Sequence, residues 1–158
     1  FDDYSLVTCT ICHMRALIQR VKYAKVTVNN EIVGSIGSGL CVFVGVTHTD
    51  DTEKSRKLAK KITNLRIFDD SEGVMNLSPL ETDSEILVVS QFTLYGDTSR
   101  GNRPSWIAAA RPEQAEPLIE DVVQTLLEAG LKVSTGVFQA YMEVELLNDG
   151  PSTVILEI

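Results

Sequence analysis

Alternating apolar and polar positions predict a strand-rich beginning of the chain. Residues 14–28 end in the alternation Val-Thr-Val, which is typical of a strand with one buried face. The polar residues 29–31 follow, and residues 32–36 are again strand-like, so we expect a hairpin. Residues 40–47 form a continuous apolar run, which predicts a buried strand.

Two later segments have the periodicity of amphipathic helices. The first starts at Asp50, which together with Glu53 resembles a capping box, and its buried stripe comprises Leu58, Ile62 and Leu65. The second contains Pro117, which we expect near its first turn, and it ends at Gly130. Its apolar positions are Leu118, Ile119, Val122, Val123, Leu126 and Leu127.

The rest of the chain is interpreted as loops and short strands. We expect loops over residues 69–79 and 90–111, with a short buried strand over residues 85–89 between them. Further strands are expected over residues 132–134, 142–148 and 152–158. Helices and strands do not alternate regularly, which argues against a doubly wound sheet. We therefore predict a single α+β domain, with mostly antiparallel sheets in a barrel-like arrangement packed with two main helices.

The well-patterned part of the sequence begins at Met14. Residues 1–13 are interpreted as an N-terminal extension, either a cloning remnant or a read-through leader, and residues 14–158 as the domain. This length suffices for a sizeable apolar core. The sequence has no apolar run near 20 residues and no signal-peptide pattern, so we expect a cytoplasmic protein.

The net charge of −8 is unevenly distributed. Residues 1–111 hold 13 basic and 13 acidic side chains, whereas residues 112–158 hold one basic and nine acidic ones. An acidic chain is a poor general nucleic-acid binder. A local basic face, such as the lysine-rich residues 54–61, could still attract an RNA end, or it could be an ordinary solvated helix face.

A cysteine motif near the start of the chain matches a haem attachment pattern. Residues 9–13 read Cys-Thr-Ile-Cys-His, and c-type haem attaches to C-x-x-C-H. Haem attachment also needs export, which the sequence does not indicate. A zinc site would need four ligands, and only Cys41 and His48 remain as neutral nitrogen or sulfur donors. We expect no metal and no cofactor, and keep a small haem protein as an alternative.

Polar residues follow directly after the predicted strand over residues 85–89. Residues 90–93 read Ser-Gln-Phe-Thr, and Thr93 could be a nucleophile only if a base activated it. The two histidines, His13 and His48, form no Ser-His-Asp pattern. Backbone N–H groups at the strand end could form an oxyanion hole, with the assisting group supplied by the substrate. The alternative is a polar strand end whose hydrogen bonds are satisfied internally.

Residues 148–151, Asn-Asp-Gly-Pro, separate two strand-like runs. Pro151 cannot donate to a sheet ladder, so a turn is the ordinary interpretation. The bond before proline is also the one where a cis peptide costs little, and a cis-proline usually has a purpose. These residues alone leave open both a turn and a rigid piece of displayed backbone.

Several motifs taken together resemble the D-aminoacyl-tRNA deacylases. Residues 14–21, Met-Arg-Ala-Leu-Ile-Gln-Arg-Val, are followed by NLRIFDD, MNLS, ILVVSQFTLYGDT, GNRPSW and NDGPST. The similarity covers residues 14–158. Its two most specific motifs, in combination, are Ser-Gln-Phe-Thr at residues 90–93 and Asn-x-Gly-Pro-x-Thr at residues 148–153.

The resemblance implies a homodimer that hydrolyses the ester between a D-amino acid and the 3′-terminal adenosine of tRNA. In that family the Gly-Pro peptide is cis and projects from one subunit into the active site of the other. A rigid backbone carbonyl can select an amino group by geometry and leave no room for an L side chain. Glycine has no side chain, so glycyl-tRNA is a candidate secondary substrate. The competing hypothesis is a non-catalytic dimer that binds an RNA end or a protein.

Residue roles also follow from the resemblance. The catalytic positions are Ser90, Gln91, the Phe92 backbone N–H and Thr93. The substrate-binding positions are Arg20, which would hold the Gly-Pro segment, and Gly136, Phe138, Met142, Asn148, Gly150 and Pro151. The missing base favours Thr93 as a positioning group over a nucleophile, with the ribose 2′-hydroxyl assisting. Gln139 and Tyr141 depart from the family pattern, in which a small residue and often an acid are expected.

Overall fold

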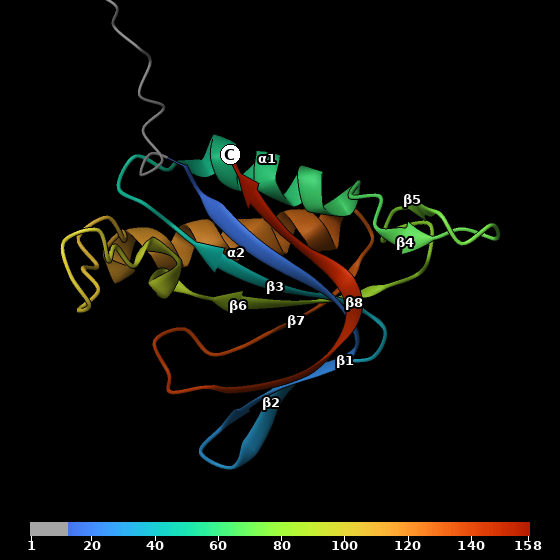
Figure 1. Cartoon of the computed structure of the whole chain (residues 1–158), viewed down its shortest axis with the longest axis horizontal. Helices are drawn as coiled ribbons and strands as arrows, with labels where there is room; N and C mark the ends of the chain where they lie inside the picture. Colours follow the sequence, from blue (N-terminus) through green and yellow to red (C-terminus); the bar gives the residue numbers. More distant parts are fainter. Residues whose placement is uncertain (1–12) are drawn as a thin grey trace, which may run out of the picture.

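One long strand joins the two parts of the main sheet. In the computed structural model, which describes residues 13–158, β1 (Arg15–Val28) pairs antiparallel with β3 (Gly39–Gly45) through its first half and with β2 (Glu31–Ile36) through its second. Its other edge pairs antiparallel with β8 (Glu143–Glu157). Figure 1 shows β1 and β8 running side by side through the middle of the molecule.

The main sheet is mixed and curls toward closure. β6 (Glu85–Ser90) lies parallel to β3, and β7 (Lys132–Thr135) lies parallel to β6. Ser134 on β7 donates from Oγ to the Ser35 carbonyl on β2 at 3.3 Å, so the two ends of the strand order approach each other (Figure 1). The predicted barrel-like α+β fold with two main helices is confirmed, and it contains two parallel pairings.

Both main helices cover one face of this sheet (Figure 1). α1 (Thr52–Thr63) and α2 (Pro112–Glu128) pack on each other and on the strands through a buried apolar cluster. Its members include Ile18, Val42, Leu58, Ile62, Ile86, Val122 and Leu126. Among the residues that the structure describes, no helix is long and apolar enough to cross a membrane.

The start of α1 differs by one residue from the predicted capping box. Asp51, and not Asp50, caps the helix, because its side chain accepts a hydrogen bond from the Lys54 N–H at 3.0 Å. Asp50 is buried and accepts from the Thr47 N–H at 2.8 Å. Burial raises the pKa of the Asp50 carboxyl. Because Asp50 and Asp51 are adjacent and either could cap the helix, the sequence alone did not distinguish between the two possible helix starts.

The second helix begins earlier than predicted. Pro112 occupies its first position, where a missing N–H costs nothing, and Pro117 lies in the second turn and not in the first. The apolar stripe starts only at Leu118, which is why the pattern placed the helix start too late. The predicted end is correct: Gly130 follows the helix with φ +96°, a left-handed conformation that glycine adopts without strain.

Some segments expected to be irregular are regular. β4 (Phe68–Asp69) and β5 (Met75–Leu77) form a small antiparallel hairpin inside the expected loop over residues 69–79. A 3-10 helix, η1 (Phe92–Tyr95), follows β6 inside the other expected loop. β8 runs through residues 148–151 as one strand, where two strands were expected. Strands of two or three residues are too short to show a period, which explains the first miss.

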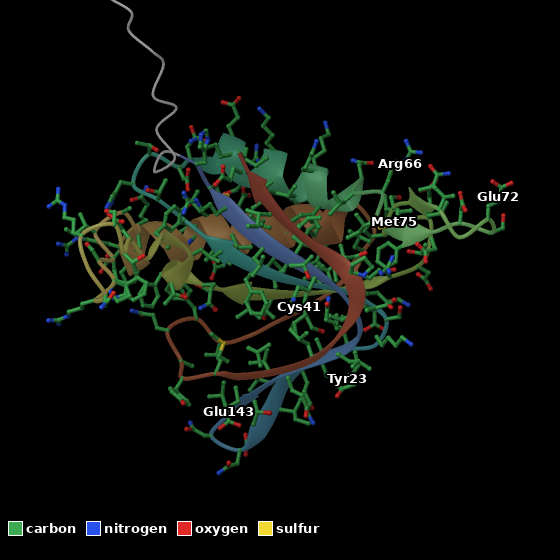
Figure 2. All side chains as sticks on the ribbon, viewed as in Figure 1. Tyr23, Cys41, Arg66, Glu72, Met75 and Glu143 are labelled. Carbon is green, nitrogen blue, oxygen red and sulfur yellow. The ribbon has the colours of Figure 1, made fainter. Side chains whose placement is uncertain are left out.

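A second, smaller core fills the inside of the curled sheet. It comprises Val21, Ala24, Val26, Ile36, Cys41, Leu87 and Val89. Figure 2 shows Cys41 in the middle of the sheet, and burial raises the pKa of its thiol to about 12. This thiol therefore stays protonated at neutral pH and packs as an apolar group.

Candidate active site

The Ser-Gln-Phe-Thr segment forms the end of β6 and the turn that follows it. Ser90 is the last residue to pair with β3, opposite Val44. The Gln91 N–H donates to the Val44 carbonyl at 2.8 Å, and the chain then enters η1. Phe92 and Thr93 are both exposed at this point. The backbone thus changes from a buried strand to an open turn within two residues.

The side chains of Gln91 and Thr93 contact each other. Gln91 Nε2 donates to Thr93 Oγ1. An amide N–H cannot take up a proton, so Gln91 cannot act as a base toward this hydroxyl. The contact occupies an acceptor position of the threonine oxygen and leaves the hydroxyl hydrogen available for a bond to something else. Thr93 is therefore arranged as a hydrogen-bond donor.

A glycine on β3 lets η1 lie close to the sheet. A Cβ atom at Gly45 would lie 2.9 Å from Tyr95 Cε2 and 3.1 Å from the Gln91 carbonyl oxygen. Tyr95 is buried, and its hydroxyl donates to the backbone carbonyls of Gly45 and His13. Burial raises the pKa of this phenol, so it remains a neutral donor. This packing fixes the turn that carries Phe92 and Thr93.

Residues 90–93 line a pocket of about 770 Å³. The other walls come from the start of α2, including Arg111, and from the segment before β8, including Phe138 and Met142. Phe92 and Trp106 both line this pocket. Their rings pack edge to face, with centroids 5.5 Å apart and an interplanar angle of 75°. The structure therefore brings the predicted residues Ser90, Gln91, Phe92, Thr93, Phe138 and Met142 together.

A second hollow of about 780 Å³ adjoins the first and shares Ser90, Ile119 and Phe138 with it. Gly136 lines this hollow, and a Cβ atom there would lie 2.5 Å from Met142 Sδ. The wall on α2 is acidic and includes Glu116, Glu120 and Asp121. The two hollows therefore differ in charge, although they meet at the end of β6.

The Gly150-Pro151 peptide bond is cis and lies in a bulge of β8. In the ladder with β1, Gln19 pairs with Thr153 and Val21 with Asn148, so residues 149–152 have no partners on β1. Both Gly150 and Pro151 are exposed. The backbone before the proline is thus displayed at the surface, in a bulge within a continuous strand.

Arg20 supports this bulge from beneath. Its buried guanidinium donates from Nε to the Asp149 carbonyl at 3.2 Å and lies 3.3 Å from the Asp149 carboxylate. It also donates to the Ile67 carbonyl at 2.7 Å. Asn148 Nδ2 donates to the Arg20 carbonyl at 3.1 Å. The predicted group Arg20, Asn148, Gly150 and Pro151 therefore forms one cluster.

Within one chain, this cluster lies far from the pocket. The bulge lies beside Gln19 to Val21 of β1. Followed across the sheet through β3, these β1 residues are level with the start of β6. Residues 90–93, by contrast, begin at the other end of β6. β8 and β6 are also three strand spacings apart, or about 14 Å across the sheet. Figure 1 shows the middle of β8 and the turn after β6 at opposite sides of the view.

The pocket contains few ionisable groups. Among the described residues, the side chains that line it include no histidine, lysine, cysteine or carboxylate. Nowhere in residues 13–158 do three or more His, Cys, Asp or Glu side chains gather as a metal-binding group would require. The cysteines of the Cys-Thr-Ile-Cys-His motif lie outside the described residues, and His48 bonds through Nε2 to the Ile107 carbonyl at 2.6 Å.

Sequence reasoning missed several residues of the pocket. Trp106, Arg111 and Ala115 line it, although they come from the expected loop and the start of α2. The arginine- and aromatic-containing composition of residues 100–111 was a signal for a binding surface, but no periodicity connected it to β6. Tyr141, noted as a departure from the family pattern, lies at the pocket and is 88% exposed.

Comparisons with known proteins identify first the fold of this chain and then its family. The fold is that of a solved structure described as a probable eukaryotic D-amino acid tRNA deacylase, which is 18% identical, covers 92% of this chain and 100% of that one, and has a TM-score of 0.80. The model of the family described as D-Tyr-tRNA(Tyr) deacylase matches residues 17–157. The chain belongs to this family, as its motifs predicted.

Relatives cover the same part of the chain. D-aminoacyl-tRNA deacylases of Geobacillus sp. (strain WCH70) and Brevibacillus brevis are 55% and 56% identical to it, over 91% of this chain and 95% and 99% of theirs. A solved structure titled c-Myc DNA Unwinding Element Binding Protein is 38% identical with a TM-score of 0.85, over 91% of this chain and 98% of that one.

Proposed function

We propose that this protein hydrolyses the ester that joins a D-amino acid to the 3′-terminal adenosine of tRNA. The observation that carries this function is the Ser-Gln-Phe-Thr segment, which lines a pocket together with Phe138 and Met142 in a chain of the deacylase family. The enzyme is a hydrolase acting on a carboxylic ester. It releases the free D-amino acid and tRNA and so removes the wrong enantiomer before translation. We place this activity in the cytoplasm, where aminoacyl-tRNA is used.

In this proposal Thr93 positions the substrate and does not attack it. No side chain lining the pocket within residues 13–158 can take a proton from its hydroxyl, and its neighbour Gln91 is a donor. The hydroxyl hydrogen of Thr93 can instead bond an oxygen of the aminoacyl ester. The attacking oxygen is a water molecule, and the ribose 2′-hydroxyl beside the ester assists its deprotonation.

The backbone N–H groups of Phe92 and Thr93 stabilise the developing negative charge. They open η1, and the first N–H groups of a helical turn have no acceptor within it. Two such donors directed at one oxygen form an oxyanion hole, which is worth about 10²–10³ in rate per donor. The packing of η1 against Gly45 holds these donors in place before the substrate arrives.

Chiral selection is assigned to Gly150-Pro151 of a second copy of the chain. The bulge is exposed and rigidly supported by Arg20, but it lies far from the pocket of its own chain. We therefore propose a homodimer in which the bulge of each subunit enters the pocket of the other. A backbone carbonyl there binds the α-amino group and excludes an L side chain. Glycyl-tRNA lacks that side chain and is a candidate second substrate.

Gly136 of the adjoining hollow and the pocket residues Phe138 and Met142 are assigned to the terminal adenosine. Phe138 lies where the two hollows meet, and Met142 packs against Gly136, so these residues form an apolar wall on which a base can stack. No metal and no cofactor take part in the proposed reaction. Gln139 and Tyr141 change the polar contacts at this wall relative to the family pattern.

The decisive experiment compares hydrolysis of matched D-Tyr-tRNA and L-Tyr-tRNA by the purified protein, with a metal chelator present. We expect rapid cleavage of the D-ester and none of the L-ester. A folded protein that cleaves neither ester would refute the enzymatic function and favour a protein that only binds an RNA end. Cleavage of both esters would refute the assignment of Gly150-Pro151 as a chiral filter while keeping the hydrolase.

A further inference from the structure

Exposed aromatic side chains gather at one place on this molecule. Among residues 13–158, four aromatic side chains are at least two-fifths exposed: Tyr23 at 42%, Phe92 at 55%, Trp106 at 41% and Tyr141 at 88%. Three of these four line the pocket at the end of β6, whereas Tyr23 lies on β1 (Figure 2). Such a concentration of exposed apolar surface marks a binding site.

Two of the three aromatic rings at this rim, Phe92 and Trp106, are held by contacts with their neighbours. Phe92 and Trp106 make an edge-to-face contact, which is a favoured arrangement for two rings. Trp106 also packs on Gly96, where a Cβ atom would lie 2.6 Å from Trp106 Cζ3. The indole is thus anchored on one side and exposed on the other, which is how a stacking platform is built.

Positive charge accompanies these rings. Residues 96–111 contain Arg100, Arg103 and Arg111 and a single acid, Asp97, in a chain with net charge −8. Arg111 lines the pocket, and Arg100 and Arg103 lie in the turn that the Asp97–Ser105 bridge closes, directly before Trp106. The Asp97 carboxylate accepts the Ser99 N–H at 2.9 Å, and this backbone hydrogen bond lowers its pKa. All three arginines are exposed. The adjoining hollow has the opposite character, since its wall carries Glu116, Glu120 and Asp121.

This distribution of charge favours one exit for the RNA. A terminal adenosine held between Phe138 and Met142 is preceded by a phosphate and by further unpaired nucleotides, which must leave across the rim. The acidic hollow repels phosphate, whereas the pocket rim, with its aromatic rings and Arg111, attracts both parts of a nucleotide. Single-stranded nucleic acids are bound elsewhere by this same combination of stacking and cationic side chains.

We propose that Phe92, Trp106 and Tyr141, together with Arg100, Arg103 and Arg111, bind the unpaired nucleotides that precede the terminal adenosine of tRNA. This proposal rests on the proposed function, because it assigns the substrate segment next to the ester. Stacking tolerates any base, and phosphate contacts carry no sequence information. The surface therefore accepts the single-stranded 3′ end that all tRNAs share and does not distinguish one amino-acid family from another.

Trp106 is the only tryptophan in the sequence, so its fluorescence reports on this surface directly. The purified protein is titrated with the unacylated trinucleotide CCA and, separately, with adenosine monophosphate. We expect CCA to quench the Trp106 emission and to bind at least about fivefold more tightly than the mononucleotide, since one further base stacks on the platform. Equal affinities for the two ligands, or an unchanged emission, would overturn the proposal.

Variants then separate stacking from charge, with labelled CCA binding measured by fluorescence anisotropy. Trp106→Ala is expected to weaken binding by roughly 5- to 150-fold, and Trp106→Phe, which keeps a ring against Gly96, to restore most of it. Arg103→Ala is expected to reduce the slope of log affinity against log salt by about 0.7, the effect of one lost phosphate contact. Lys132→Ala removes an exposed charge at the start of β7 and is the matched control.

Two results would overturn the proposal at this stage. One is an equal effect of Arg103→Ala and Lys132→Ala on affinity and salt slope. The other is a Trp106→Ala variant that changes the oligomeric mass of the protein while CCA binding stays unchanged, because the rim would then be a protein interface. Failure of the proposed function looks different: CCA binds at Trp106 as expected, but D-Tyr-tRNA is not hydrolysed.

Discussion

Arg20 and Asp149 contact each other twice, immediately before the Gly150-Pro151 bond. The buried guanidinium donates from Nε to the Asp149 carbonyl at 3.2 Å and lies 3.3 Å from the Asp149 carboxylate. A third bond, from Nη1 to the Ile67 carbonyl at 2.7 Å, ties the same guanidinium to the chain before β4. One planar cation therefore connects the bulge of β8 to the body of the protein.

Arg20→Lys should loosen the bulge while keeping the charge. Lysine has a single point-like ammonium group and cannot reproduce the forked geometry, so at least one of the bonds to Asp149 and Ile67 is lost. We expect the free energy of unfolding to fall by about 1.5–3 kcal/mol, the scale of a hydrogen bond to a charged group. Hydrolysis of D-Tyr-tRNA should also fall at a temperature where the variant is fully folded, so that unfolding cannot explain the loss of activity.

Arg66→Lys is the matched control for this substitution. Arg66 also donates from Nε to a backbone carbonyl, that of Asn76, at 2.9 Å, but it is exposed and its hydrogen bonds go to Asn76 and not to residues 149–152. We expect its activity and stability to stay close to those of the unaltered protein. If Arg20→Lys and Arg66→Lys had the same small effect, the support of the bulge by Arg20 would be disproved.

Gly150→Ala should damage function and leave the fold intact. A Cβ atom at Gly150 would meet only Asn148 Oδ1, at 3.6 Å, which is an ordinary van der Waals contact. The thermal unfolding temperature should therefore stay unchanged, whereas in the proposed homodimer the added methyl group would crowd the backbone that enters the partner's pocket. We expect hydrolysis of D-Tyr-tRNA to fall by at least about tenfold, the effect of roughly 1.4 kcal/mol.

Gly37→Ala provides the comparison, since a Cβ atom at Gly37 would have no neighbour within 4 Å. Both alanine variants should unfold at the same temperature, and only Gly150→Ala should lose activity. A Gly150→Ala protein with unchanged rate and unchanged preference for the D-ester would show that this backbone takes no part in chiral selection.

Local motifs in the sequence were enough to name candidate site residues, but they did not indicate how those residues are arranged in space. The motif over residues 90–93 could be recognised because a buried strand ended abruptly in polar side chains. Nothing in the local pattern indicated that residues 148–151 would bulge from a continuous β8, because the bulge depends on pairing with β1, more than a hundred residues away in the chain. The distance between the Gly150-Pro151 bulge and the pocket is likewise a property of the sheet order, which periodicity does not encode.

Gly136→Ala should narrow the proposed adenosine site. The added methyl group would lie 2.5 Å from Met142 Sδ, and the end of a methionine side chain can move, whereas backbone cannot. We expect a cost of about 1–3 kcal/mol in the free energy of unfolding and a higher KM for D-Tyr-tRNA. The double variant with Met142→Ala removes the clash and should be less destabilised than the sum of the two single variants. Strict additivity would contradict the contact.

Thr93→Ala should slow hydrolysis by no more than about 10²-fold if Thr93 only positions the ester, because a lost polar contact in the transition state is worth that much. If Thr93 were the nucleophile, its replacement by alanine would slow hydrolysis by a far larger factor. Thr93→Ser keeps the hydroxyl and its partner Gln91, and we expect it to recover most of the rate. Single-turnover kinetics with D-Tyr-tRNA measure the chemical step in all three proteins.

A role of Thr93 as the nucleophile would give a different and recognisable result. If Thr93 attacked the ester, the unaltered protein would form a covalent aminoacyl-enzyme, visible as an initial burst of released tRNA and as a mass increase of one tyrosyl group on the peptide that contains Thr93. We expect neither, because the described residues that line the pocket offer no base to activate the hydroxyl. A trapped acyl-threonine would require the base to come from the substrate, with the ribose 2′-hydroxyl activating Thr93 and not water.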